Sequence, residues 1–294
     1  MILSVIILNY NSFQLTADCI RSVLPFLEAG EGELILVDND STECAPEKFL
    51  ELFPSIKLVK SGRNGGFAYG NNKGIEKASG EFILLLNSDT LLTEDSFRPC
   101  LAYFRKLPDT GVLGCRMTYP DGRVQYTARR FRSISWELLD LFRFIPLLMG
   151  YEKRSVKMLG KYFRHDRDLE CDWLNGAFFL FRKELLQKLP GQKLDERFFM
   201  YAEDQLWCEQ IKNLGFKNRF FAGTTIIHIN SGSTAPEKQL ALRKTMMKNE
   251  LAIMRERKGN GIYYQAFRLI YGLKEGGRNA LKWLIYKCTG KLLR

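Results

Sequence analysis

No stretch of about 18 consecutive apolar residues, the length that a membrane-spanning helix needs, occurs in the sequence. The best candidate, residues 134–149, contains Glu137, Asp140 and Arg143. Met1 leads directly into strand-like sequence, without the basic segment and cleavage site of a secretory signal. We therefore expect a cytoplasmic protein with no membrane-spanning helix.

Cysteine and histidine are also too sparse for a zinc finger or a disulfide scaffold. The seven cysteines form no Cys-x-x-Cys pair, and the two histidines are His165 and His228. This usage is typical of a reducing compartment. The glycine-rich segment 62–74 matches neither a dinucleotide fingerprint nor a Walker loop, so it indicates either an anion near a helix start or a plain turn.

Charge is distributed unevenly along the chain, whose net charge is +11. Residues 1–90 hold 7 basic and 12 acidic residues, so they carry −5 and leave +16 for the remainder. The basic part includes residues 128–168, which we expect to be irregular around an apolar piece at 136–149. This excess of positive charge indicates an anionic partner, either a membrane surface or a nucleic acid.

A buried strand at residues 82–86 organises the chain. These five consecutive apolar residues lack the alternation of a strand with one wet face. Similar segments at 4–8, 33–37, 56–59 and 112–115 alternate with helical patterns before residue 118. This order predicts an α/β fold with a mostly parallel central sheet flanked by helices.

Polar residues follow these strands at 9–11, 38–39, 64–72 and 87–89. The carboxyl ends of parallel strands lie along one edge of a sheet, where ligands bind. An acid there can hold a divalent cation and, through it, a diphosphate. Ordinary turns are the alternative for each segment alone, because Asn, Ser and Asp are turn-forming residues.

Together these segments resemble the family 2 glycosyltransferases of the GT-A fold, and most closely the bacterial rhamnosyltransferase-like branch. The matching motifs lie at residues 5–11, 37–41, 64–67, 71–74, 86–89, 173–177 and 203–204. The resemblance implies a Rossmann-like GT-A domain over 1–232, with a nucleotide-sugar-binding half (1–117) and an acceptor and catalytic half (118–232). A helical, basic, amphipathic extension follows over 233–294.

The resemblance also implies roles for the residues at the motif positions. The residues expected to contact the donor are Leu8, Tyr10, Asp38, Asn39, Asn64, Asn72, Asn87 and Ser88. Leu8 and Tyr10 would line the base pocket, and Asp38 or Asn39 would bond the pyrimidine. Trp173 and Asn175 would shape the acceptor site, although Trp173 fits a core position equally well.

Asp89 matches the last acid of the family's Asp-x-Asp motif, which holds a divalent cation, Mg²⁺ or Mn²⁺, on the donor diphosphate. The first acid of that motif is replaced by Asn87, so the motif supplies a single carboxylate. Several family members carry a metal-binding histidine after the last strand, which makes His228 the second candidate ligand. A packed or surface histidine is the alternative.

The pair Glu203-Asp204 matches the family's late acidic pair, whose aspartate is the general base. Single displacement at an anomeric carbon needs a carboxylate to accept the proton of the acceptor hydroxyl. Asp204 is therefore the expected base, with Glu203 beside it. The alternative is a pair of acids at a helix start with no further role.

Residues 261–294 combine seven bases with many apolar residues and a single acid, Glu275. Such a helix suits an anionic membrane surface, and a helix packed on the domain with solvated lysines is the alternative.

We therefore expect an inverting, metal-dependent glycosyltransferase, peripheral on the inner face of the cytoplasmic membrane. The expected donor is dTDP-L-rhamnose, and the expected acceptor is a saccharide or lipid-linked saccharide of bacterial cell-surface polysaccharide synthesis. One alternative is another donor, such as a UDP-hexose. The other is a non-enzymatic nucleic-acid-binding protein, but RRM, KH and helix-turn-helix signatures are absent, so no nucleic-acid partner is expected.

Overall fold

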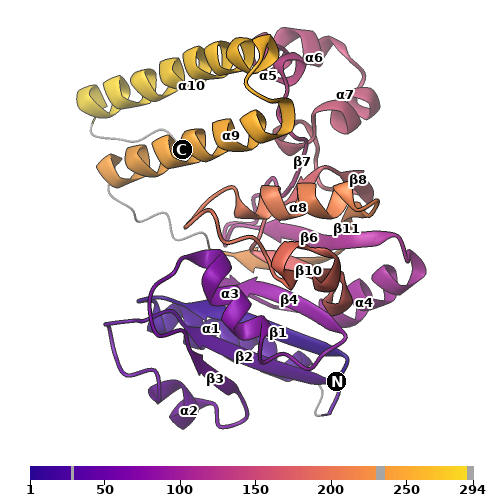
Figure 1. Cartoon of the computed structure of the whole chain (residues 1–294), viewed down its shortest axis with the longest axis vertical. Coiled ribbons are helices and arrows are strands. Elements are labelled where there is room, and N and C mark those ends of the chain that lie inside the picture. Colours follow the sequence, from indigo (N-terminus) through magenta and orange to yellow (C-terminus); the bar gives the residue numbers. More distant parts are fainter. Residues whose placement is uncertain (28–29, 230–235, 290–294) are drawn as a thin grey trace. The chain divides into compact units, whose positions relative to one another are not determined.

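The structure, a computed structural model, describes residues 1–27, 30–229 and 236–289 (Figure 1). The chain forms two compact units. The first comprises Met1–Arg130 and Leu159–Asn230, and the second comprises Phe131–Met158 and Ser231–Arg294. No helix among the described residues combines the length and apolar character needed to span a bilayer.

A curled mixed sheet forms the centre of the first unit. Four strands lie parallel in the order β3 (Lys57–Lys60), β2 (Gly32–Asp38), β1 (Leu3–Asn9) and β4 (Phe82–Asn87). The order continues with β10 (Phe178–Arg182), β6 (Thr110–Thr118), β11 (Lys217–His228) and β5 (Thr90–Leu91). β8 (Leu169–Cys171) pairs with β11, and β7 (Ala128–Arg129) pairs with β9 (Trp173–Leu174).

Side-chain alternation places helices on both faces of this sheet. Val5 and Ile7 of β1 belong to one core cluster, and Ile6 belongs to the other, because successive residues of a strand point to opposite faces. The first cluster includes residues of α1 (Phe13–Val23), α2 (Lys48–Leu52) and α4 (Phe97–Lys106). The second includes residues of α3 (Phe67–Ile75) and α8 (Glu203–Asn213).

The expected α/β architecture is confirmed, with one addition. β10 lies between β4 and β6 and runs antiparallel to both, so the second half of the sheet is mixed. The sequence predicts one buried strand over 173–181, but the structure divides it into β9 and β10 at the turn 175–177, and an apolar run carries no information about strand direction. Short 3-10 helices complete this unit at Leu24–Phe26, Gly160–Tyr162, Lys183–Lys188 and Pro190–Gln192.

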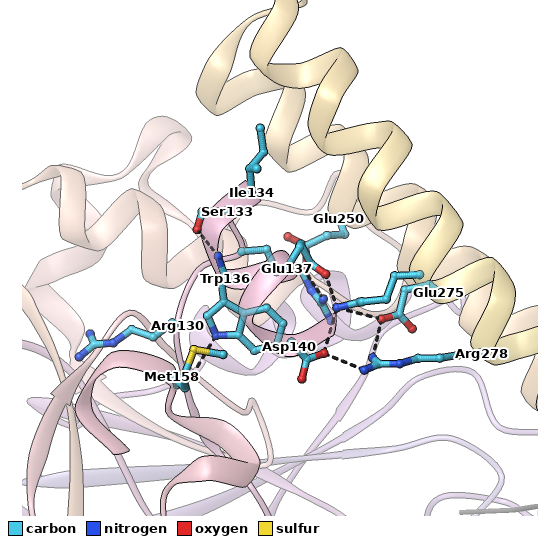
Figure 2. Close-up of polar contacts among 12 residues, drawn as sticks. Arg130, Ser133, Ile134, Trp136, Glu137, Asp140, Met158, Glu250, Glu275 and Arg278 are labelled. Atoms are coloured by element: carbon cyan, nitrogen blue, oxygen red, sulfur yellow. Dashed lines mark hydrogen bonds and ion pairs between the residues drawn. The ribbon is translucent and has the colours of Figure 1, made fainter. Parts of the chain in front are cut away.

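The second unit is helical. It contains α5 (Ile134–Leu141), α6 (Phe144–Leu148), α7 (Tyr151–Met158), α9 (Pro236–Lys258) and α10 (Ile262–Thr289). Much of the segment expected to be irregular is therefore helical. The apolar core of this unit joins α9 and α10 through Met254, Tyr264, Phe267 and Tyr271. Charged side chains of α5 and α10 are buried together beside it (Figure 2).

Candidate active site

The carboxyl ends of β1, β2 and β4 meet at one edge of the sheet. Asn9 pairs with Asp38 across the first two strands, and Leu8 pairs with Asn87 across β1 and β4. The buried Asn9 amide donates to Asp38 Oδ1 (3.0 Å) and to Ser41 Oγ (3.0 Å). Asp38 is therefore held by its neighbours in a fixed orientation at this edge.

The glycine-rich segment 62–74 closes over the same edge. Asn39 Nδ2 donates to Asn64 Oδ1 (2.9 Å), which also accepts from the Gly66 amide (3.1 Å). Gly66 has φ of +90°, and a Cβ there would lie 2.2 Å from the carbonyl oxygen of Phe199. Only glycine therefore fits this position, which brings the segment against the loop that precedes α8.

Three other donor candidates occupy different environments. Leu8 is half-buried, and Tyr10 is 47% exposed at the tip of the edge. Asn72 is buried, and its amide bonds the main chain of Leu194 in both directions and reaches Glu196 Oε1 (2.7 Å). Asn72 thus ties α3 to residues 194–196, and its hydrogen-bonding groups are already engaged.

Asp89, two residues beyond β4, lies beside His228, the last residue of β11, and next to the half-buried Ser88. His228 Nε2 is 3.2 Å from Asp89 Oδ1 and 3.5 Å from Asn87 Nδ2. The other ring nitrogen, Nδ1, is 2.8 Å from Oε1 of Gln125. The side chains of Asp89, Asn87 and His228 therefore lie close together, although His228 is far from the other two in the sequence.

Gln125 fixes the tautomer of His228. The Gln125 amide nitrogen donates to the carbonyl oxygens of His228 and Thr118, so the remaining atom, Oε1, must accept from His228 Nδ1–H. With Nδ1–H directed at Gln125, Nε2 is the ring nitrogen that faces the Asp89 carboxylate. A ring nitrogen and a carboxylate oxygen 3.2 Å apart could both bind one cation. Metal-binding histidines commonly donate their other ring N–H to an oxygen atom, as His228 does to Gln125.

The described residues contain no group of three His, Cys, Asp or Glu side chains that could hold a metal ion. Among the described residues, Asp89 and His228 are the predicted ligands that the fold brings together at this edge. A cation held there would take its remaining ligands from oxygen atoms of a bound diphosphate and water.

The acidic pair lies at the start of α8 behind a strained turn. Tyr201 and Ala202 adopt left-handed conformations, with φ of +69° and +72°. Such strain in non-glycine residues costs about 1–3 kcal/mol each and concentrates at functional sites. The Asp204 carboxylate accepts hydrogen bonds from the Gly176 amide (3.0 Å) and the Gln205 amide (2.8 Å).

Burial raises the pKa of both acids, but hydrogen bonds from two neighbouring amides and a nearby cation oppose the increase at Asp204. Burial, together with repulsion from Asp204, raises the pKa of Glu203 from 4.5 to about 8, and Glu203 Oε2 has no hydrogen-bond partner in the described part of the chain. Burial also raises the pKa of Asp204, but the two amide donors and Arg129 oppose that increase. The ionised form of Asp204 is therefore the better supported by hydrogen bonds, and Asp204 is half-buried, whereas Glu203 is buried.

The acid pair and the metal candidates belong to one contiguous site. The main-chain amide of Asn87 donates to the carbonyl oxygen of Ala177 (3.1 Å). The main-chain amide of the preceding residue, Gly176, donates to the Asp204 carboxylate. The turn 173–177 thus joins the end of β4 to α8. In the same turn, Asn175 Oδ1 accepts from the Ala177 amide (2.9 Å), and the half-buried Trp173 lies under the guanidinium of Arg129, 5.1 Å from its ring centre.

Sequence analysis did not single out Gln125 or Arg129. Gln125 follows the Asp-Gly turn at 121–122 and matches no motif, and its partner His228 is 103 residues away. Arg129 is one of many bases in a basic segment. A contact map would have been needed to find either residue.

This arrangement of strand ends, metal candidates and a half-buried carboxylate agrees with what the resemblance to GT-A glycosyltransferases leads us to expect. Residues 4–189 match the model of Glycosyl transferase family 2, and the chain belongs to that family. The N-acetylglucosaminyl-diphospho-decaprenol L-rhamnosyltransferase of Mycobacterium tuberculosis is 24% identical over 226 residues, 71% of this chain and 70% of the relative. The O-antigen biosynthesis protein RfbC of Myxococcus xanthus is 28% identical over 68% of this chain, which spans 15% of that protein.

Solved structures confirm the GT-A fold. The mannosyltransferase PcManGT of Pyrobaculum calidifontis, in complex with GDP-Man and Mn²⁺, matches 99% of this chain and 76% of its own with a TM-score of 0.61 and 15% identity. S. aureus TarS 1-349 in complex with UDP-GlcNAc matches 92% of this chain and 70% of its own, with a TM-score of 0.52 and 18% identity.

The raised pKa of Glu203 predicts a pH-dependent stability. Because the native state holds this proton more tightly than the unfolded state, the contribution is complete below about 4.5 and is lost as the pH rises through about 8. Glu203→Gln should therefore reduce the fall in unfolding free energy between pH 6 and pH 9, measured by urea denaturation. Glu209→Gln on the same helix is the control, and an unchanged slope in Glu203→Gln would contradict the assignment.

Proposed function

We propose that the protein transfers L-rhamnose from dTDP-L-rhamnose to a saccharide or lipid-linked acceptor in bacterial cell-surface polysaccharide synthesis. The observation that best supports the transfer reaction is a series of contacts between the two parts of the site. It runs from Asp89 and His228 to Asn87, and from the turn that contains Gly176 to Asp204. The mycobacterial L-rhamnosyltransferase supports the rhamnosyl donor. A UDP-hexose is the second candidate donor, supported by the structure of TarS that holds UDP-GlcNAc.

In the proposed reaction Asp204 accepts the proton of the acceptor hydroxyl. The oxygen of that hydroxyl bonds to the anomeric carbon while the bond from this carbon to the diphosphate breaks, so the anomeric configuration inverts once. Glu203 stays protonated and leaves Asp204 as the single charged base. A carboxylate in this role accelerates transfer by about 10²- to 10⁴-fold.

Asp89 and His228 would hold Mg²⁺ or Mn²⁺ at the diphosphate. The cation would neutralise negative charge that develops on the leaving group. The PcManGT structure with GDP-Man and Mn²⁺ supports a divalent cation in this fold. Gln125 would act as a positioning residue that keeps the lone pair of His228 Nε2 directed at the cation.

Replacing metal-site residues tests this assignment. Asp89→Ala should abolish Mn²⁺-dependent nucleotide binding in calorimetry, because it removes the only carboxylate of the motif. Gln125→Leu should weaken Mn²⁺ binding by about 10- to 100-fold and should mix the His228 tautomers in ¹⁵N NMR spectra. Asp121→Asn on the neighbouring exposed turn is the control. Equal nucleotide affinity in wild type and Asp89→Ala would refute the metal role.

A thermal-shift panel tests the donor. A ligand that binds only the native state raises Tm, by an amount that grows with its concentration relative to Kd. dTDP-L-rhamnose with Mg²⁺ or Mn²⁺ should raise Tm more than UDP-glucose, UDP-GlcNAc or GDP-mannose. A larger increase in Tm with a UDP-sugar would contradict dTDP-L-rhamnose as the donor and support a UDP-hexose. Salt-sensitive binding to bulk DNA, with no response to any sugar nucleotide, would favour a nucleic-acid-binding protein instead.

We also infer that the protein works as a peripheral protein on the inner face of the cytoplasmic membrane. Support comes from the net charge of +11 and from the large apolar side chains that the second unit exposes. An acceptor anchored in that membrane would be concentrated at the same surface.

A further inference from the structure

Residues 141–149 form the most exposed apolar segment of the second unit. Phe144 is 61% exposed, Leu147 is 64% exposed and Leu148 is 84% exposed. Pro146 is the single buried residue of this segment, which we call the apex. Large apolar side chains gathered in this way mark an interaction surface rather than an ordinary surface.

The acids next to the apex point away from the solvent. Asp140 of α5 is paired with Lys274 Nζ (3.0 Å) and Arg278 Nη2 (2.8 Å) of α10, and Glu137 is also paired with Lys274 (Figure 2). The Lys274 side chain is 1% exposed. Lys274 and Arg278 are two of the seven bases of 261–294 that the sequence predicts at a membrane surface. In the structure they neutralise the buried acids of α5 instead.

The charge left on the outside of the apex region is positive. Arg143 lies within the apex, and Lys153 and Lys157 of α7 follow it, all exposed. Glu152 is the single exposed acid in residues 131–158. Apolar side chains ringed by bases complement a surface that is apolar inside and anionic at its boundary.

We propose that the apex inserts into the headgroup region of an anionic lipid membrane. This inference rests on the proposed function for the membrane location, and it names the part of the chain that makes the contact. A protein partner covers one face of a helix, whereas lipid surrounds a protrusion. Because nearly every residue of the apex is exposed around a single-turn helix, lipid is the occupant that can cover all of them.

Vesicle sedimentation of the full chain tests the proposal. The probes are phosphatidylcholine vesicles with and without phosphatidylglycerol, in the absence of any donor or acceptor. Leu147→Ser/Leu148→Ser should lower the partition coefficient on the anionic vesicles by at least about tenfold, because two large side chains no longer enter the lipid. The matched control is Leu269→Ser/Leu273→Ser on α10, where both leucines are exposed. The control should bind within about threefold of wild type.

Wild-type binding should weaken with salt and with removal of phosphatidylglycerol. Equal binding by the apex variant and wild type would overturn the proposal. A wild-type dimer that becomes monomeric in the apex variant, measured by light scattering without lipid, would also overturn it and assign the apex to a second copy. Donor binding is measured separately, so failure of the proposed transferase activity would remain distinct from failure of membrane binding.

Discussion

Replacing Asp204 with asparagine is expected to lower kcat by about 10²- to 10⁴-fold, with little change in donor affinity. Asparagine keeps the size of the side chain but cannot accept the proton of the acceptor hydroxyl. The Gly176 and Gln205 amides bond different oxygens of the Asp204 carboxylate, so asparagine keeps an acceptor for one of them and loses the other hydrogen bond. Steady-state kinetics with the donor identified by the thermal-shift panel, together with calorimetric donor binding, checks both expectations.

Two companion variants separate catalysis from structure. Glu203→Gln should cost much less in kcat, because Glu203 is already protonated near neutral pH. Glu209→Gln on the same helix should retain wild-type kcat. If Asp204→Asn kept near-normal transfer and Glu203→Gln lost it, Glu203 would be the general base. If both variants transferred the sugar normally, neither acid would be the general base.

Lys274→Met is expected to destabilise the second unit by up to about 3 kcal/mol, because it removes the buried cation that two buried carboxylates share, while Arg132 stays paired with Glu137 (2.7 Å). The Lys274 ammonium contacts Glu137 and Asp140, whose side chains are 0% and 2% exposed. Arg278 remains beside Asp140 and limits the loss. Hydrogen exchange of amides in α10, measured on the full chain, reports the stability of this unit.

The exposed Lys287 supplies the matched control, and Lys287→Met should change stability by less than about 0.5 kcal/mol. Adding Asp140→Leu to Lys274→Met should recover part of the loss, since an apolar replacement no longer needs a buried cation. A loss of less than about 1 kcal/mol in Lys274→Met would show that the carboxylates reach water or other partners. Phe267 and Tyr271 are buried core residues of this unit, so deleting residues 261–294 would remove part of its core and would not test membrane binding alone.

Much of the sheet and its edge could be predicted from local sequence. Continuous apolar runs at 82–86 and 33–37 identify strands buried on both faces, and the polar residues that follow them identify the edge. Parallel pairing then places the ends of these strands along one edge, whereas the strand order that puts Leu8 opposite Asn87 comes from the structure. The direction of β10 could not be predicted, because antiparallel insertion depends on the path of the chain between residues 118 and 178.

Contacts between distant residues account for what the sequence did not predict. The tautomer of His228 depends on Gln125, and the acids of α5 are neutralised by bases more than 130 residues later. The expectation of irregular structure over 128–168 was wrong for 134–158, where three short helices form and the acids of α5 find their charge partners on α10. Asn72 lies in a motif, yet its amide is engaged with Leu194, a contact that no local pattern reveals.

The close approach of Gly66 to Phe199 limits how this enzyme could be re-engineered. The Phe67 amide donates to the Phe199 carbonyl (3.0 Å), and any side chain at position 66 would collide with that oxygen. Phe199 precedes the strained turn that leads to Glu203 and Asp204. A graft that exchanges the 62–74 loop to change donor preference must therefore include residues 199–204, or the new loop will displace the acidic pair.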